Sequence, residues 1–245
     1  MEEKVSVIIA AKNEAPRIDR VLHIACDHPL VDEVIVVNDG STDDTAKVCE
    51  KCAAKIITNK VCQGKTLSIK EGLKAAKNEV VVLLDADLKG LTHKNIDDLA
   101  RPVLDKKVDF TLSIRGNSSM IYKIFHMDFV SGERAIRKSI MSDPEIWSKP
   151  KIGYGLEVLM NNSFLTRKKR FISVYLPNLY ATPKSEKMSY WRGYLADLTM
   201  VFNIFRAFPI LLVGLQFVEM VYLNHKYHKE LNIREQHVDI KRTDS

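Results

Sequence analysis

The first half of the chain alternates short apolar runs with segments of helical spacing. The runs are rich in Val and Ile and cover residues 5–10, 33–38, 54–58 and 79–84. Runs that are apolar on both faces and alternate with helices are typical of a parallel sheet covered by helices on both sides. The pattern therefore predicts an α/β fold for this half of the chain.

The pattern changes after about residue 105. Residues 108–114 and 169–177 predict two further strands, and residues 129–142 predict a turn that leads into a helix. With 245 residues, the chain is long enough for one large domain and an appended segment. We divide it into a main domain (1–189), an apolar helical segment (190–224) and a polar tail (225–245).

The apolar segment is aromatic at its start but is interrupted by Arg206, Pro209 and Glu219. The run between these charges is too short for a membrane span, which needs about 20 residues. We expect instead a helix pair that lies on a membrane or packs against a partner subunit, the second of which would give a homo-oligomer. The alternative is burial against the chain's own domain.

Charge and cysteine content narrow the partners and the compartment. The formal charge of +6 favours anionic partners, but the basic residues are spread widely and form no nucleic-acid motif. Phosphates or an anionic membrane surface fit better. No secretory leader pattern opens the chain, so we expect a cytoplasmic protein with reduced thiols. The pair Cys49 and Cys52 lacks the second pair, or the nearby His, of a zinc site.

Polar residues follow the first two predicted strands, at the sheet edge where ligands bind in such folds. Glu14 follows the first strand and could accept hydrogen bonds from ribose hydroxyls, or it could merely start a helix. Asp39 ends the second strand. Gly40 permits a tight turn, and Ser41 or Thr42 is expected to cap the next helix. Capping does not account for Asp39.

The third loop places Gly64 and Lys65 at a predicted helix start, where free backbone N–H groups and an ammonium suit a phosphate. Neither a P-loop nor a dinucleotide-binding glycine pattern is present.

Asp85 and Asp87 follow the fourth strand. Two like charges so close raise each other's proton affinity unless a cation lies between them. Such an oxygen pair suits Mg²⁺ or Mn²⁺ when substrate phosphates and water supply the other ligands. The alternative is that one of the two caps a turn.

Together the stretches SVIIAAKNE, VIVVNDGSTDDT, GKTLSIKEGL and VVLLDADL resemble family 2 glycosyltransferases of the GT-A fold. The resemblance implies a Rossmann-like, mostly parallel sheet flanked by helices, with the apolar helical segment after it. It also implies a nucleotide-diphospho-sugar donor, with UDP or GDP, and a metal held by Asp85 and Asp87. The implied donor-binding residues are Ala10, Glu14, Asp39, Gly64, Lys65, Asp85 and Ala86.

The second half is similar to the polyprenyl-phosphate (dolichol-phosphate mannosyltransferase) branch of that family. The stretches DFVSGERAIRKSIM and GYGLEVLM carry this likeness, together with an arginine after a strand and a looser serine–lysine segment. Lys89 departs from the branch, because a lysine cannot ligate a cation. The implied catalytic residues are Asp87, Glu157 and Asp128, and the implied acceptor or phosphate contacts are Arg115, Ser131, Gly132, Arg134, Lys184 and Lys187.

The function implied is metal-dependent sugar transfer to a lipid-linked or polyprenyl-phosphate acceptor, by a protein peripheral to the cytosolic face of a membrane. An ionised lipid phosphate needs no strong base, so Glu157 would orient groups. A hydroxyl acceptor would need Glu157 or Asp128 as base. The glucosyl-3-phosphoglycerate synthase branch shares the DADL and GYG-x-E patterns, which leaves a soluble phosphoglycerate-like acceptor open. A non-catalytic, nucleotide-binding membrane scaffold is the alternative outside catalysis.

Overall fold

The computed structural model describes residues 3–52, 54–149, 155–182 and 208–233. Its strands are β1 (Val5–Ala11), β2 (Val31–Asp39), β3 (Lys55–Asn59), β4 (Val80–Asp85), β5 (Phe110–Arg115), β6 (Arg134–Arg137) and β7 (Phe171–Leu176). Its α-helices are α1 (Ile18–Cys26), α2 (Thr45–Cys49), α3 (Lys65–Ala75), α4 (His93–Leu104), α5 (Met120–Ile124), α6 (Gly155–Thr166) and α9 (Ile210–Glu230). Two 3₁₀ turns cover Lys138–Ser142 and Pro144–Trp147.

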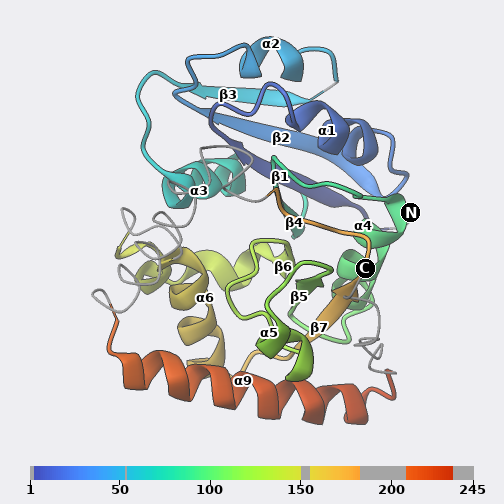
Figure 1. Ribbon diagram of the computed structural model, residues 1–245, viewed down its shortest axis with the longest axis vertical. Helices are drawn as coiled ribbons and strands as arrows, with labels where there is room; N and C mark the ends of the chain where they lie inside the picture. Colours follow the sequence, from blue (N-terminus) through green and yellow to red (C-terminus); the bar gives the residue numbers. More distant parts are fainter. Residues whose placement is uncertain (1–2, 53, 150–154, 183–207, 234–245) are drawn as a thin grey trace.

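The strands form one sheet in the order β3-β2-β1-β4-β6-β5-β7 (Figure 1). Strands β1 to β4 are parallel to their neighbours, and β5 is parallel to β7. Only β6 runs antiparallel among the described strands, between β4 and β5. The six apolar runs predicted from the sequence all form strands, so the predicted α/β class is confirmed.

The prediction of a helix within residues 129–142 is wrong. Residues Arg134–Arg137 form β6, and only the short 3₁₀ turn Lys138–Ser142 follows. The four residues of β6 pair on one side with β4 and on the other with β5. Hydrogen bonding to two neighbouring strands thus overrides the local spacing of charged and apolar residues.

The core has one layer on each face of the sheet, as the alternation of side chains along a strand requires. Val7 and Ile9 of β1 pack with apolar residues of α1 and α4. Ile8 faces the other way and belongs to the layer that contains buried residues of α3, α6 and α9. Both faces of the sheet are thereby covered by buried apolar side chains.

Helix α9 lies along one end of the molecule, below α5 and α6 in the view of Figure 1. Its inner face is Val213, Gln216, Met220, Asn224 and His228, all buried. The alternative, burial against the chain's own domain, therefore applies to this face. The helix runs without a break through the expected boundary at 224/225, and the start of the apolar segment (190–207) lies outside the described residues. In the part of the chain that is described, no helix has the length and apolar character to cross a membrane.

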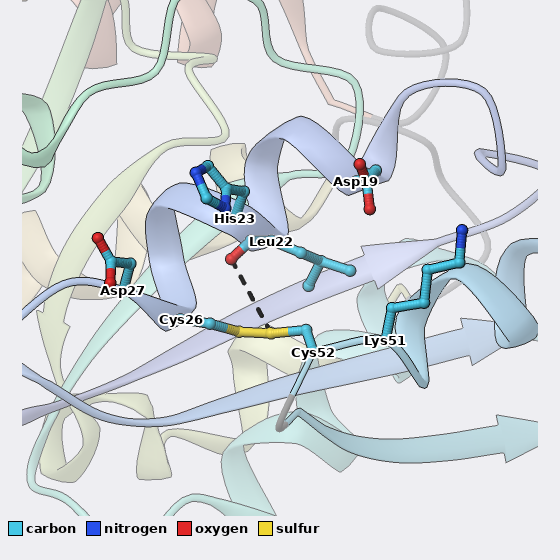
Figure 2. A pocket seen from close by; sticks show the side chains of 7 residues that line it. All are labelled: Asp19, Leu22, His23, Cys26, Asp27, Lys51 and Cys52. Carbon is cyan, nitrogen blue, oxygen red and sulfur yellow. Dashed lines mark hydrogen bonds between the residues drawn. A yellow bond between two sulfur atoms is a disulfide. The ribbon is translucent and has the colours of Figure 1, made fainter.

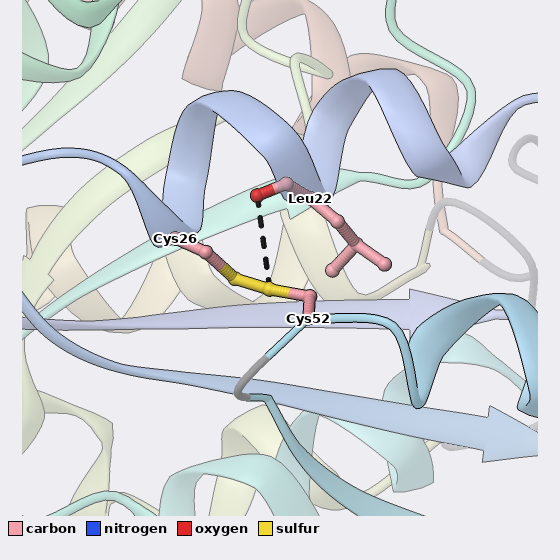
Figure 3. The surroundings of a disulfide bond; sticks show 3 residues. All are labelled: Leu22, Cys26 and Cys52. Atoms are coloured by element: carbon pink, nitrogen blue, oxygen red, sulfur yellow. Dashed lines mark hydrogen bonds between the residues drawn. A yellow bond between two sulfur atoms is a disulfide. The ribbon is translucent and has the colours of Figure 1, made fainter.

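A disulfide bond joins Cys26, at the end of α1, to Cys52, which lies three residues after the end of α2 (Figure 2). The expectation of reduced thiols is therefore wrong for these two residues. Cys52 pairs with Cys26 and not with its C-x-x-C neighbour Cys49, which is free and buried in the core, where burial raises the pKa of its thiol to about 11. Sγ of Cys52 lies 4.0 Å from the carbonyl oxygen of Leu22, which is a contact only, since a disulfide sulfur carries no hydrogen (Figure 3).

A surface pocket of ≈ 320 Å³ lies over this disulfide. It is lined by Asp19, Leu22, His23, Cys26, Asp27, Lys51 and Cys52 (Figure 2). None of the residues that follow the predicted strands contributes to it. The pocket is therefore a feature of the α1–α2 surface and does not include the polar strand ends.

Two helical glycines predict opposite effects of the same substitution. A Cβ on Gly72 of α3 would clash with Cγ2 of Ile8, whereas a Cβ on Gly214 of α9 would meet nothing within 4 Å. Removing a helical glycine stabilises a helix by about 1 kcal/mol, but overpacking a core costs about 1–3 kcal/mol. We expect Gly72→Ala to lower the free energy of unfolding and Gly214→Ala to raise it, measured by urea denaturation. Shifts of the same sign would contradict the close packing of α3 on β1.

Candidate active site

The polar strand ends meet at one edge of the sheet. Ala10 of β1 pairs with Val37 of β2 on one side and with Asp85 of β4 on the other. Asp39 lies two residues beyond Val37, at the end of β2. Because the carboxyl ends of parallel strands point the same way, the loops after β1, β2 and β4 project from the same edge. The expected donor-binding residues Ala10, Asp39, Asp85 and Ala86 are thereby brought to neighbouring strands.

Asp39 organises the loop that leads into α3. Its carboxylate accepts hydrogen bonds of 2.8 Å from the backbone N–H groups of Gln63 and Gly64, and others from Cys62 Sγ and Asn59 Nδ2. Burial acts to raise the pKa of Asp39, but these hydrogen bonds together outweigh it and leave the pKa below its ordinary value. The side chain is thus a buried carboxylate that fixes the start of α3.

The loops after β1 and β2 interlock. The amide oxygen of Asn13 accepts from the Thr42 N–H at 2.8 Å, and the hydroxyl of Ser41 accepts from the Asn13 N–H at 3.0 Å. The prediction that Ser41 or Thr42 caps the next helix is wrong, because α2 begins only at Thr45 and Asp43 accepts from the Thr45 N–H instead. The chain needs Ser41 and Thr42 to hold the neighbouring loop.

Glu14 is buried within this pair of loops. Its backbone N–H donates to the hydroxyl of Thr45 at 2.9 Å, and its carboxylate accepts from Nε of Arg17 at 2.5 Å. Its carbonyl oxygen accepts from the N–H groups of Arg17 and Ile18, at the entry to α1. The alternative role, starting a helix, is therefore met by the Glu14 backbone, while the side chain is held by an ion pair.

Lys65 links three elements at the centre of the site. As expected, it is the first residue of α3, after Gly64 with a positive φ of 95°. Its ammonium lies 2.8 Å from Oδ1 of Asp85 and 3.2 Å from Oε1 of Glu157, on α6. Glu157 is 1 % exposed, and its Oε2 has no hydrogen-bond partner among the described residues. One cation thus offsets the charge of two carboxylates, one of them buried.

Gly132 lies directly against this ion cluster. A Cβ at this position would lie 2.7 Å from the ammonium nitrogen of Lys65 and 3.0 Å from both carboxylate oxygens of Asp85. A side chain at this position would displace the ammonium of Lys65 or the carboxylate of Asp85 from their present positions. The loop that precedes β6 therefore approaches the end of β4 through its backbone.

Arg20 stabilises the loop that carries Asp87 through hydrogen bonds to its backbone. Nη2 of Arg20 donates to the Asp87 carbonyl at 2.9 Å and Nε to the Leu88 carbonyl at 2.6 Å. The hydroxyl of Thr182 also donates to the Asp87 carbonyl, at 2.6 Å. Lys89 pairs its backbone with Tyr180 in an isolated bridge. These contacts fix the backbone beside the two aspartates without using their carboxylates.

The fit of a divalent cation can be judged from the donor set. Within the described ranges, no three His, Cys, Asp or Glu side chains are grouped so as to hold a metal by themselves. Mg²⁺ and Mn²⁺ often bind through one or two carboxylates, with phosphates and water as the other ligands. Asp85 and Asp87 fit that second arrangement, and the unpaired oxygen of Glu157 adds negative potential beside it.

A second cluster of buried charges is formed by Arg115 with Asp128 and Glu133, which lie on either side of Gly132 in the sequence. Arg115, at the end of β5, places Nη1 3.3 Å from Oε1 of Glu133 and Nη2 3.9 Å from Oδ2 of Asp128. The hydroxyl of Ser118 donates to Asp128 at 2.6 Å, and that of Ser131 to Glu133 at 3.0 Å. Burial raises the pKa of both carboxyls, and the charge of Arg115 opposes this only in part. Both acids therefore take up protons more readily than exposed ones.

Arg134 is completely buried and points into its own loop. Its guanidinium donates to the carbonyls of Ser131 and Phe129, each at 2.8 Å, and to Oδ1 of Asn161 at 2.7 Å. Burial lowers its pKa to about 10, so the group stays charged at neutral pH. These contacts show that it shapes the loop 129–134, and its expected contact with an acceptor stays a prediction.

Sequence reasoning missed two residues of this site. Glu133 lies between two residues that the resemblance singles out, so its position was the available signal. Arg20 gave no signal, because its role depends on a contact with a loop 67 residues away in sequence. Lys184 and Lys187, expected to contact phosphate, lie outside the described residues.

Comparison with known proteins identifies the family. Residues 6–165 match the model of glycosyl transferase family 2. The chain is 32% identical over 100 residues to the 4,4'-diaponeurosporenoate glycosyltransferase of Staphylococcus aureus (strain USA300), and 30% identical over 102 residues to that of the bovine strain RF122 / ET3-1. These matches cover 39% and 40% of the chain but only 27% of each relative.

The fold is similar to solved structures of glucosyl-3-phosphoglycerate synthase from Mycobacterium tuberculosis. A complex with Mn²⁺, UDP-glucose and phosphoglyceric acid gives a TM-score of 0.64 at 20% identity, over 83% of this chain and 79% of that one. A complex with Mg²⁺ and UDP gives 0.61 at 22% identity, with the same coverage. At this identity the likeness shows the fold, and the GT-A expectation is confirmed.

The chain therefore belongs to glycosyl transferase family 2. The family model covers the strands β1 to β6 and nearly all of α6, which include every described element that contributes to the ion cluster around Lys65. The expected enzyme class, a glycosyltransferase, is confirmed at the level of the family.

The buried carboxylate of Asp39 predicts an acid-dependent stability. Because its folded pKa lies below the unfolded value, its stabilisation is complete above about pH 4 and is lost as the pH falls through the folded pKa. We expect Asp39→Asn to lower the free energy of unfolding by about 1–3 kcal/mol at pH 7, with a smaller difference from wild type at pH 3.5. Urea denaturation at both pH values measures this, with Asp32→Asn at an exposed position as control. A difference that does not depend on pH would contradict it.

Proposed function

We propose that this member of glycosyl transferase family 2 transfers a sugar from a UDP- or GDP-sugar to a lipid-linked or polyprenyl-phosphate acceptor. The observation that carries the proposal is the ion cluster at the carboxyl edge of the sheet. There the ammonium of Lys65 meets Asp85 and Glu157, at the start of a helix whose free N–H groups suit a phosphate. Such a cluster can exchange carboxylate contacts for the phosphates of a donor.

On the donor side, the interlocked loops provide a surface for a nucleoside. We assign Asp39 to the base, Glu14 to the ribose, and Gly64 and Lys65 to the diphosphate. Support comes from their common edge of the sheet and from the hydrogen bonds that hold Asp39 as a carboxylate. Ala10 and Ala86 would present backbone and a small side chain where the donor passes close to the sheet.

We assign a Mg²⁺ or Mn²⁺ ion to Asp85 and Asp87. When bound, it supplies positive charge that stabilises the departing nucleoside diphosphate. Lys65 adds a second positive charge beside the same leaving group, and the backbone contacts of Arg20 keep the aspartate loop in place. The similar structures are complexes with Mn²⁺ and UDP-glucose or with Mg²⁺ and UDP, which supports this assignment.

On the acceptor side, Arg115 is the proposed contact for a phosphate, with Ser131 and Gly132 nearby on the loop before β6. Its guanidinium keeps 17% of its surface exposed although it contacts Glu133 and Asp128. A lipid phosphate is already ionised, so Glu157 would orient groups instead of removing a proton. Lys184 and Lys187 remain proposed phosphate contacts from the segment outside the described residues.

A soluble acceptor is the second candidate. It is favoured by coverage, because the match spans 79% of the chain in a complex with phosphoglyceric acid but only 27% of the diaponeurosporenoate glycosyltransferases. A hydroxyl acceptor needs a base, and burial raises the pKa of Asp128, which makes its carboxylate a stronger proton acceptor than an exposed one. A nucleotide-binding scaffold without catalysis is the third, and donor turnover would exclude it.

The first functional prediction concerns the metal. We expect release of UDP or GDP from a panel of nucleotide sugars to require Mg²⁺ or Mn²⁺ and to stop in EDTA. Asp87→Asn should lower this release at least about a hundredfold, because one carboxylate charge is lost, while the urea midpoint changes little at a loop position. Near-normal turnover in this variant, or turnover in chelator, would contradict the metal role of Asp87.

The second functional prediction concerns Lys65. Lys65→Ala removes the charge that faces the proposed diphosphate and leaves Asp85 and Glu157 to repel it. We expect the dissociation constant for UDP or GDP, measured by calorimetry, to rise about tenfold. Lys60→Ala, at an exposed lysine of the same loop, is the matched control. Equal affinity in wild type and Lys65→Ala would remove Lys65 from the donor site.

A further inference from the structure

Exposed apolar side chains gather on two helices. Twelve large hydrophobic side chains are exposed within the described residues, and ten of them belong to α5, the residue after it, and α9. On the α5 side these are Met120, Ile121, Ile124 and Phe125. Single exposed hydrophobic residues are ordinary, but a contiguous group of this size marks an interaction surface.

On α9 the exposed side chains form a stripe. Leu211, Leu215, Val218 and Tyr222 recur at helical spacing on the face opposite the buried one, and Ile210 and Leu212 widen the stripe at its start. Since the helix is apolar on both faces over its first half, packing against its own domain accounts for only one of them. The outer face has no partner among the described residues.

The two groups form one surface, which we call the α5–α9 surface. The ring of Phe125 lies 5.8 Å from that of Phe217, between centroids, and Tyr122 lies 6.2 Å from the same ring. Nδ2 of Asn224 donates to the carbonyl of His126 at 3.1 Å. Figure 1 shows α5 directly above the middle of α9.

The chain carries a formal charge of +6, which favours an anionic partner for its exposed surfaces. Residues 117–127 contain no acidic residue, and α9 carries two, Glu219 and Glu230, the second of which lies 3.8 Å from Lys226. Lys226 and Lys229 lie on the last turns of α9, beyond Tyr222. An apolar helix face with an aromatic residue and lysines near it is typical of helices that lie in a bilayer interface.

We propose that the α5–α9 surface docks on an anionic lipid bilayer, with α9 in the plane of the interface. The apolar side chains would enter the boundary of the acyl chains to a depth of about 5–10 Å, and the lysines would face the headgroups. A single such helix with no spanning segment is sufficient for peripheral attachment. The proposal deepens the proposed function, because it names the surface through which a lipid acceptor would be reached.

The surface adjoins the proposed acceptor side of the site. Helix α5 begins five residues after Arg115, and the intervening Ser118 donates its hydroxyl to Asp128. A lipid phosphate at headgroup depth would therefore lie near the end of β5. This step rests on the proposed function, whereas the docking itself rests only on the exposed side chains and charges.

The test is co-sedimentation of the full chain with vesicles of phosphatidylcholine and phosphatidylglycerol, without donor. We expect the wild type to sediment. Leu215→Glu and Ile121→Glu should each weaken the partition at least about tenfold, since each replaces an apolar side chain that would enter the bilayer with a charge. Val61→Glu, at a hydrophobic residue 74% exposed elsewhere, is the matched control and should sediment like the wild type. Binding should persist in 0.5 M salt, because the apolar contacts carry most of it.

Three results would overturn the proposal: wild type that stays in the supernatant, glutamate variants that sediment like wild type, or a wild-type dimer that Leu215→Glu dissociates. The last would assign the surface to a second copy of the chain. Donor turnover in solution separates this test from the proposed function. We expect Leu215→Glu to lose docking and to keep that turnover. A wild type that docks on vesicles but does not turn over a donor would contradict the proposed function and leave the docking proposal intact.

Discussion

The arrangement of this site depends on one cation shared by two carboxylates. The ammonium of Lys65 joins the start of α3 to Asp85 at the end of β4 and to Glu157 on α6, so that three elements converge on one charge. Without it, Glu157 would be a buried carboxylate next to another negative group, which is costly in a protein interior. Gly132 lies against the same cluster through its backbone, which ties the loop before β6 to the same point.

The strands were predictable from the sequence because each buried strand of a parallel sheet is apolar on both faces. The positions of Asp39, Lys65, Asp85 and Asp87 followed, since each adjoins such a run. Strand β6 was not predictable, because its four residues are held by partners on both sides and not by their own spacing.

Contacts distant in sequence account for what else was missed. Cys26 pairs with Cys52 across 26 residues, and the hydroxyls that look like a helix cap instead hold a loop 28 residues away. The burial of Glu133 and Arg134 is likewise set by tertiary packing, because nothing in their side chains indicates whether water reaches them. Chemistry at strand ends is therefore readable from sequence, whereas its supporting contacts require the fold.

The Cys26–Cys52 bond adds a covalent constraint to the part of the molecule that contains β2 and α2. The loop that it closes contains all of β2 and α2, including Asp39 and the residues that hold Asn13. In the chain-entropy model, a cross-link over such a loop lowers the conformational entropy of the unfolded state and so raises the free energy of unfolding by about 3 kcal/mol. Local opening of this unit is thereby coupled to the redox state of its surroundings. The same chain would hold the loops after β1 and β2 less tightly in a reducing compartment than in an oxidising one.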